Sequence, residues 1–148
     1  MSIRSSFRTI LGILLLSTSC GFAVGQTIWH VDDDAPNDPG PGDVTVSDPL
    51  EDGSPAHPFD AIQEGIDAAA VGDEVVIADG LYAGLGNRDL DFHGKGITVR
   101  SASGDPEKCV IDCELSGRGF YFHSGETSAV VLEGLTIQNG ASVESGGG

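Results

Sequence analysis

Basic side chains are scarce in this chain. Among 148 residues there are 7 lysines and arginines against 23 aspartates and glutamates, which gives a formal net charge of −16. A surface this negative repels phosphate backbones, so the composition argues against a nucleic-acid-binding protein. It suits solubility, cation binding, or contact with neutral or basic partners. The simplest interpretation is a solvated acidic exterior.

Cysteine is also rare, with three in the chain. Cys109 and Cys113 are four residues apart, and in an extended strand their Cα atoms would lie roughly 13 Å apart at about 3.3 Å per residue. That distance is too long for a disulfide without an intervening turn. No second Cys or His pair lies nearby, so a zinc site is not expected either. We expect two free thiols.

Motifs that mark cofactors and activated nucleophiles are missing. The sequence contains no G-x-S-x-G and no P-loop, and Gly84-x-Gly86 lacks the third glycine of a dinucleotide site. The histidines show no metal-ligand spacing, and the metal ligands are left unknown. No catalytic and no cofactor-binding residues are predicted. The four histidines are His30, His57, His93 and His123.

Long apolar runs are absent except near the N-terminus. Ile10 to Leu16 follows Arg4 and Arg8 and is too short to span a bilayer. Residues 1–25 are therefore predicted to be a secretory signal peptide. This predicts export to the extracellular space, the cell surface or the periplasm, with no transmembrane segment after signal removal.

The end of the signal offers two processing sites. Ala23-Val24-Gly25 fits the small-x-small pattern of a signal peptidase and leaves Gln26 as the mature N-terminus. A lipid anchor at Cys20 is the alternative, but Ser17-Thr18-Ser19 lacks the aliphatic residue expected three positions upstream. Without the signal, five basic residues face 23 acidic ones, and the net charge becomes −18.

Residues 26–58 predict a first strand followed by an exposed loop. Thr27 to Val31 is β-branched and aromatic, as strands are. Asp32 to Pro58 contains six of the seven prolines, and eight acidic residues lie from Asp32 to Asp52 without a basic one. Proline and like-charge repulsion both oppose regular packing there.

One helix is predicted, within residues 59–71. Asp60 can accept hydrogen bonds from the first-turn amides, and Gln63 three residues later completes a capping-box pattern. Ile62 and Ile66 form an apolar stripe at helical spacing. The helix is therefore expected to be amphipathic and to bury one face.

After the helix, short β-branched or aromatic runs alternate with Gly, Asp and Asn. Val76 to Val99 and Val99 to Phe122 are each 23 residues, and Ile111 to Leu132 is 21. Interleaved series with a period near 22 predict a coil whose turns carry two or three short parallel strands. The runs are EVVIA (Glu74 to Ala78), GITVRS (Gly96 to Ser101), CVIDC (Cys109 to Cys113), GFYFH (Gly119 to His123) and VVLEGLTIQ (Val130 to Gln138).

We therefore predict an all-β fold, a right-handed parallel β-helix (a single-stranded solenoid) with an N-terminal capping α-helix. Residues 72–148 would form its first rungs, truncated after about two to three and incomplete at the C-terminus. Ile62 and Ile66 would cover its open end at Val75 to Ile77. An antiparallel sandwich is the alternative, but only Asn139-Gly140 resembles a hairpin turn.

Seven segments follow one another in a distinctive order: VDDDA (Val31 to Ala35), HPFDAIQEGIDAA (His57 to Ala69), GDEVVIADGLY (Gly72 to Tyr82), GITVRS, VIDC, GRGFYFHSGE and GLTIQNG. This order resembles the N-terminal portion of pectate-lyase-like right-handed parallel β-helix proteins of exported bacterial type. The resemblance covers nearly all of the mature chain and implies an architecture. It does not imply an activity, because that fold hosts lyases, hydrolases, epimerases, adhesins and inert repeat proteins.

The resemblance also implies that catalytic residues lie on middle rungs, beyond the visible ones. No active-site residue is therefore transferred to this chain. Because about three or more repeats are usually needed for a stable stack, we expect the natural product to be longer than residues 26–148.

Asp32-Asp33-Asp34 is the best metal candidate, since hard oxygen ligands suit Ca²⁺. The calcium-loop pattern with alternating acids and a fixed glycine is absent, and three adjacent carboxylates cannot all face one ion. A solvated turn after the first strand is favoured. No cofactor is predicted, and Ca²⁺ is kept as an alternative.

Glycoside cleavage needs a pair of acidic residues, and uronate cleavage needs a base, often arginine. The predicted rungs contain residues of both kinds. With so many acids such pairs arise by chance, and ion pairing with the acidic surface explains the arginines more simply. The acidic candidates are Asp89, Asp91 and Asp112, and the basic ones are Arg88, Arg100 and Arg118.

Two functions follow. The first is an exported non-catalytic β-helix module, structural, adhesive or polysaccharide-binding, whose partners are extracellular polysaccharide or cell-surface components. The alternative is the N-terminal part of a polysaccharide lyase, glycoside hydrolase or uronate epimerase whose catalytic rungs lie beyond residue 148. The absence of a convincing acid–base pair favours the first, and leaves open whether the protein is an enzyme.

Overall fold

The computed structural model describes residues 25–34 and 48–141. Residues 1–24 of the predicted signal, including Cys20, and residues 35–47 of the acidic loop lie outside these residues. Within them, no helix is long and apolar enough to cross a bilayer. The elements are β1 (Ile28–Val31), α1 (Ile62–Ala68), β2 (Glu74–Ile77), β3 (Gly80–Tyr82), β4 (Thr98–Ser101), β5 (Cys109–Asp112), β6 (Val131–Glu133) and β7 (Thr136–Gln138).

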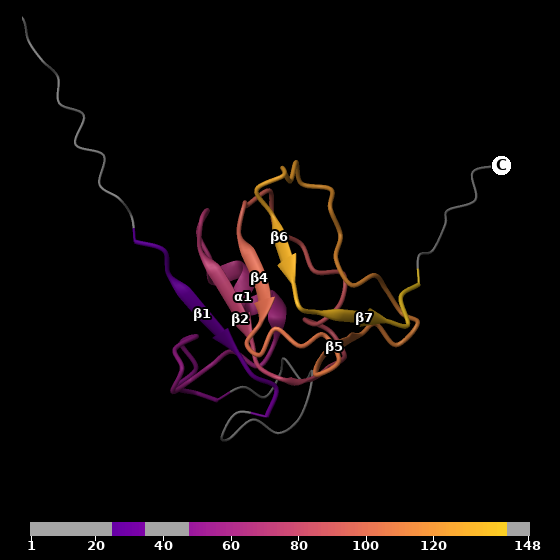
Figure 1. Cartoon of the computed structure of the whole chain (residues 1–148), viewed down its shortest axis with the longest axis horizontal. Helices are drawn as coiled ribbons and strands as arrows, with labels where there is room; N and C mark the ends of the chain where they lie inside the picture. The colour runs from indigo at the N-terminus through magenta and orange to yellow at the C-terminus, as the bar shows by residue number, and fades with distance from the viewer. Residues whose placement is uncertain (1–24, 35–47, 142–148) are drawn as a thin grey trace, which may run out of the picture.

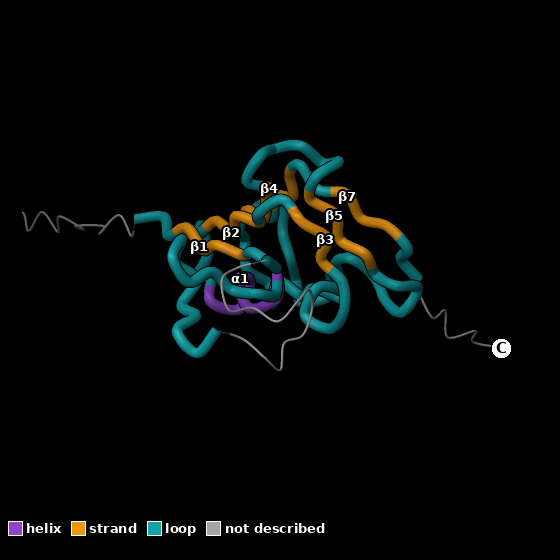
Figure 2. Tube along the Cα trace, turned by 90° about the horizontal axis from the view of Figure 1, so that it is seen from below, coloured by secondary structure: helices purple, strands orange, loops and turns teal. Residues whose placement is uncertain are grey.

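The strands form two small parallel sheets (Figure 1). One has the order β1-β2-β4-β6 and the other β3-β5-β7, and every neighbouring pair is parallel. The chain passes from the first sheet to the second three times, at β2–β3, β4–β5 and β6–β7. Figure 2 shows the two sheets beside each other, with α1 below β1 and β2.

The predicted closed β-helix is wrong for the described part of the chain. The described residues form two separate sheets of four and three short strands with one helix, and no closed solenoid. A third side would need a continuous strand ladder, but there the chain makes only an isolated bridge between Leu90 and Phe120. Left-handed residues such as Asp89, His93 and Gly94 interrupt the extended backbone in that region.

The predicted 22-residue register is also wrong. Val99 pairs with Leu132, 33 residues later, and not with Phe122. Ile111 pairs with Ile137, 26 residues later, and not with Leu132. Loops of different length separate the paired strands, so a uniform period cannot hold. Apolar residues at several spacings matched the pattern equally well, and the sequence could not distinguish them.

The core is closed at β1 and open at β6 and β7. Val75 and Val99 are fully buried in register with each other, whereas their partner Leu132 is 38% exposed. In the second sheet Ile111 is fully buried and its partner Ile137 is 47% exposed. Each strand covers the strand before it in the sheet, so β6 and β7, the last strands of the two sheets, remain exposed.

Helix α1 is shorter than predicted and packs against β1 and β2. Ile62 and Ile66 are fully buried, as the apolar stripe predicted. Gly65 permits the close approach, because a Cβ there would meet Val31 and Val75. A side chain at this position would push the helix off both strands.

The predicted cap at Asp60 is incorrect. The helix begins after Ala61, and the Ala61 N–H donates to Glu64 Oε2 at 3.2 Å. The Ile62 N–H donates to Asn87 Oδ1 at 2.9 Å, so a distant side chain caps the first turn. At the other end Lys95 Nζ donates to the carbonyl oxygens of the last turn. Contacts distant in sequence therefore define both helix ends.

Candidate functional site

Two loop segments, 89–93 and 119–123, lie side by side. The Leu90 N–H donates to the Gly119 carbonyl at 3.0 Å, and the Tyr121 N–H donates to the Leu90 carbonyl at 2.8 Å. Inside, Phe92 stacks on Phe120 with ring centroids 5.5 Å apart. The intervening Asp91 is partly exposed. The packing of the aromatic rings thus fixes a row of polar side chains on the outer surface.

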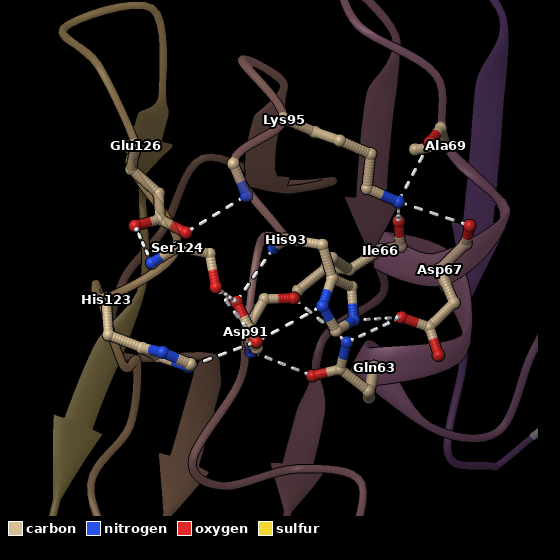
Figure 3. A network of polar contacts seen from close by, with 11 residues as sticks. Gln63, Ile66, Asp67, Ala69, Asp91, His93, Lys95, His123, Ser124 and Glu126 are labelled. Atoms are coloured by element: carbon tan, nitrogen blue, oxygen red, sulfur yellow. Dashed lines mark hydrogen bonds and ion pairs between the residues drawn. The ribbon is translucent and has the colours of Figure 1, made fainter.

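Asp91 is the centre of this outer surface (Figure 3). Its Oδ2 lies 3.1 Å from His93 Nδ1 and 3.1 Å from His123 Nε2. Its Oδ1 accepts the His93 backbone N–H at 2.8 Å and the Ser124 hydroxyl at 3.2 Å. Groups separated by about thirty residues in sequence therefore converge on one carboxylate.

These donors change the acidity of Asp91. The His93 backbone N–H, and then the two imidazoles and the Ser124 hydroxyl, hold the pKa of the carboxyl below its usual value against a smaller opposing effect of burial. A general acid needs a raised pKa to keep its proton near neutral pH. Asp91 is therefore suited to accepting hydrogen bonds and not to proton donation.

Helix α1 supports the cluster from one side. His93 Nε2 lies 3.1 Å from Asp67 Oδ1, so this imidazole bridges the carboxylates of Asp67 and Asp91. Gln63 Nε2 donates to the Asp91 carbonyl at 3.0 Å, and Gln63 Oε1 accepts the Asp91 N–H at 2.9 Å. Gln63, predicted to complete the cap, instead holds the loop against the helix (Figure 3).

An exposed set of planar groups adjoins Asp91. The Tyr121 and His123 rings stack with centroids 4.0 Å apart, and the Arg118 guanidinium carbon lies 4.6 Å from the Tyr121 centroid. Tyr121 remains 39% exposed. Arg118 was predicted to pair with surface acids, and it instead takes a cation–π position. We call Asp91, Arg118, Tyr121, His123 and Ser124 the outer polar surface.

The predicted glycosidase acids do not converge. Asp89 Oδ1 accepts the Arg118 N–H at 3.0 Å, while Asp112 accepts hydrogen bonds from the Glu114 backbone and from Asn139. The Glu114 N–H is the largest of the effects that lower the pKa of Asp112. Asp89, Asp91 and Asp112 thus belong to three separate networks, and no acid–base pair forms among them.

Other predicted positions have structural roles. Arg88 pairs with Glu114, and Arg100 pairs with Glu74. Trp29 stacks on Phe59 with centroids 5.9 Å apart, and its indole N–H donates to Asp73 Oδ2 at 3.2 Å. Cys109 and Cys113 are free and buried, as expected, and burial raises the pKa of the Cys109 thiol to about 12. Asn139 adopts a left-handed conformation after β7.

The side chains of the predicted metal candidate, Asp32-Asp33-Asp34, do not converge as a set of three ligands. Asp33 is 3% exposed, so the expectation of a fully solvated turn is wrong for this residue. Its Oδ1 lies where a Cβ on Gly80 would be, which explains how the buried carboxyl fits. Among residues 25–34 and 48–141, the only three metal-ligating side chains that converge are those of Glu51, Asp60 and Glu64.

A shallow hollow beside β1 and β2 offers no converging charges. Its walls are mostly apolar, and its ionisable residues are His30 and Asp32. The lining residues are His30, Val31, Asp32, Pro55, Pro58, Val76, Ala78 and Ala102.

No family model, curated protein sequence or solved structure matches this chain. The candidate sites therefore depend on geometry alone. The sequence analysis missed the convergence of Asp91, His93 and His123. The signal that could have indicated it is the similarity of DLDFH (Asp89 to His93) to GFYFH, since both have large apolar residues at the second and fourth positions and end in histidine.

Proposed function

We propose that this chain is a non-catalytic module of an exported protein and that it binds a neutral polysaccharide through the outer polar surface. The observation that carries the proposal is the exposed Tyr121 ring, which contacts the planar groups of Arg118 and His123. Tyrosine offers a rigid, amphipathic contact surface at low conformational entropy cost. Sugars present both apolar C–H faces and hydroxyl groups to such a surface.

The neighbouring polar groups supply hydrogen bonds of both kinds. Asp91 is a charged acceptor, Arg118 is a donor, and the Ser124 hydroxyl can do either. Because Asp91 is held by donors on several sides, its orientation is fixed before a ligand arrives. A preorganised surface loses less entropy on binding.

The net charge selects among polysaccharides. A chain with a net charge of −16 repels polyuronates, whereas a neutral glycan carries no such penalty. The lowered pKa values of Asp91 and Asp112 also count against a role as general acid for these two residues. Both arguments favour binding over cleavage.

The test is retention of the full-length chain on insoluble neutral polysaccharides and on polygalacturonate and alginate. We expect retention on at least one neutral polymer, and at least a tenfold loss of affinity in Tyr121→Ala. Leu85→Ala is the matched control, because Leu85 is 66% exposed and lies outside the outer polar surface. Equal loss in both variants, or stronger retention on the polyuronates, would contradict the proposal.

A further inference from the structure

The carboxylates of Glu51, Asp60 and Glu64 converge beside the start of α1, on a different part of the molecule from the outer polar surface. One oxygen from each residue lies within 4.8 Å of the other two. The Asp60 N–H donates to Glu51 Oε1 at 3.3 Å, and the Ala61 N–H donates to Glu64 Oε2 at 3.2 Å. Backbone hydrogen bonds thus draw Glu51 and Glu64 in around Asp60.

Asp60 lacks the partners that a buried carboxylate normally has. It is 5% exposed, and both of its carboxylate oxygens are buried without a hydrogen-bond partner among the described residues. Buried polar groups are usually satisfied, because an unmet one costs free energy. Asp73 is equally buried, yet it accepts hydrogen bonds from the Thr27 and Ala70 backbones and the Trp29 indole. Asp60 is the exception.

None of the ion pairs within the described ranges involves Asp60 or Glu64. With three carboxylates this close together, like-charge repulsion opposes the cluster. A bound cation would relieve this repulsion and would satisfy both Asp60 oxygens.

We propose that Glu51, Asp60 and Glu64 bind a calcium ion. Carboxylate oxygens are the hard ligands that Ca²⁺ prefers, at roughly 2.3–2.6 Å from the ion. Two oxygens on opposite sides of such an ion lie about 4.8 Å apart, so the observed cluster fits within one coordination sphere. Mg²⁺ needs about 2.0–2.1 Å and strict octahedral geometry, which a partly buried cluster on a loop and a short helix satisfies poorly.

The ion would connect the loop before α1 to the start of the helix. Glu51 belongs to the loop before α1, Asp60 precedes the helix, and Glu64 lies in its first turn. Calcium would therefore fasten the loop to the helix that covers the β1 end of the core. This predicts that calcium stabilises the fold, independently of any carbohydrate.

The experiment is calcium titration of the full-length chain by calorimetry near neutral pH, together with thermal unfolding in chelator, CaCl₂ and MgCl₂. We expect one calcium per chain and a rise in Tm of roughly 10 °C at a hundredfold excess over Kd. Magnesium should give a smaller shift. Terbium provides a second readout, because Trp29 stacks on Phe59, next to Asp60, and can sensitise its luminescence.

Asp60→Asn and Glu64→Gln should each weaken calcium affinity at least tenfold. Asp60→Asn should also raise the Tm in chelator, because it removes charge repulsion, so the loss of binding cannot be ascribed to unfolding. Glu107→Gln is the matched control, since Glu107 is exposed and distant in sequence. The proposal is overturned if the wild-type chain shows no calcium binding, or if Asp60→Asn binds calcium as tightly as Glu107→Gln does.

Discussion

Two acidic clusters contact helix α1, and they differ in what surrounds the carboxylate. Asp91 lies on the outer surface, accepts hydrogen bonds from a backbone N–H and a hydroxyl, and has one oxygen 3.1 Å from a nitrogen of each of two imidazoles. Asp60 is more deeply buried, and neither of its oxygens accepts a hydrogen bond from the described residues. The pKa of Asp91 is lowered, whereas that of Glu64 beside Asp60 is raised to about 8. The hydrogen-bond donors around a carboxylate, and not the residue type, determine the direction in which its pKa shifts.

The largest expected effect is a pH dependence of stability at the buried cluster. Between pH 4.5 and about 8, the folded chain keeps a proton on Glu64 that the unfolded chain has released. This contribution is complete below pH 4.5, falls as pH rises, and is lost above about 8. The shift corresponds to at most about 5 kcal/mol, and sharing with Asp60 and Glu51 reduces it.

Chemical denaturation in chelator across this pH range measures the effect. Glu64→Gln should flatten the slope, because glutamine stays neutral and preserves the shape of the side chain. Glu107→Gln should leave the slope as in the wild type. If Glu64→Gln kept the wild-type slope, a proton retained on Glu64 would not be the cause of the pH dependence. The contrast between the raised pKa of Glu64 and the lowered pKa of Asp91 would then be wrong.

Asp33 provides an independent test of the same contrast. It is buried, its Oδ1 has no partner among the described residues, and burial followed by the charge of Asp34 raises its pKa to about 6. The groups that face it are Asp32, Asp34, Tyr82 and Cys109.

Stability should therefore fall as pH rises from 3.8 to about 6, by at most about 3 kcal/mol. Asp33→Asn should remove that slope and raise stability near neutral pH. Denaturant unfolding at both ends of this range measures the change, with Glu107→Gln as the exposed control. A less stable Asp33→Asn protein at neutral pH would show that the ionised carboxylate is required.

Local structure was largely predictable from the sequence, and long-range pairing was not. The apolar stripe of α1 and several strand positions follow from local periodicity. Strand β3 was missed because Gly80 and Leu81 give little strand signal, and Gly80 is required by the buried Asp33. The predicted strand register was wrong because register depends on loop lengths, which local periodicity does not reveal.

The candidate sites could not be predicted from the sequence for the same reason. Asp91 and His123 are 32 residues apart and meet only because Leu90 bridges Phe120. Asp60 and Glu64 are close in sequence, but Glu51 joins them through a hydrogen bond from the Asp60 backbone. A residue-by-residue search for motifs cannot detect a site whose members are assembled by the turns between strands.

Removal of the Asp91 carboxylate, the central acceptor of the outer polar surface, should have a moderate effect on stability. Asp91→Ala leaves the His93 N–H, two imidazoles and the Ser124 hydroxyl without their acceptor. Solvent can replace part of these contacts, so we expect a loss of about 1–2 kcal/mol in the free energy of unfolding. Asp91→Asn should retain part of this stability, because its Oδ1 still accepts. A loss as large as that expected from the pH titration of Glu64 would remove the distinction between the two clusters.

The smallest effect is expected at the edge of the same cluster. The Asp67 and His93 side chains are 56% and 54% exposed, and exposed ion pairs contribute about 0–1 kcal/mol. Asp67→Asn should therefore change stability by less than about 0.5 kcal/mol, and the difference should shrink further as salt screens the pair. Urea unfolding of Asp67→Asn and Asp91→Ala at low and high salt makes the comparison. If Asp67→Asn proved as costly as Asp91→Ala, the His93 bridge to α1, and not the Asp91 carboxylate, would be what holds the outer polar surface in place.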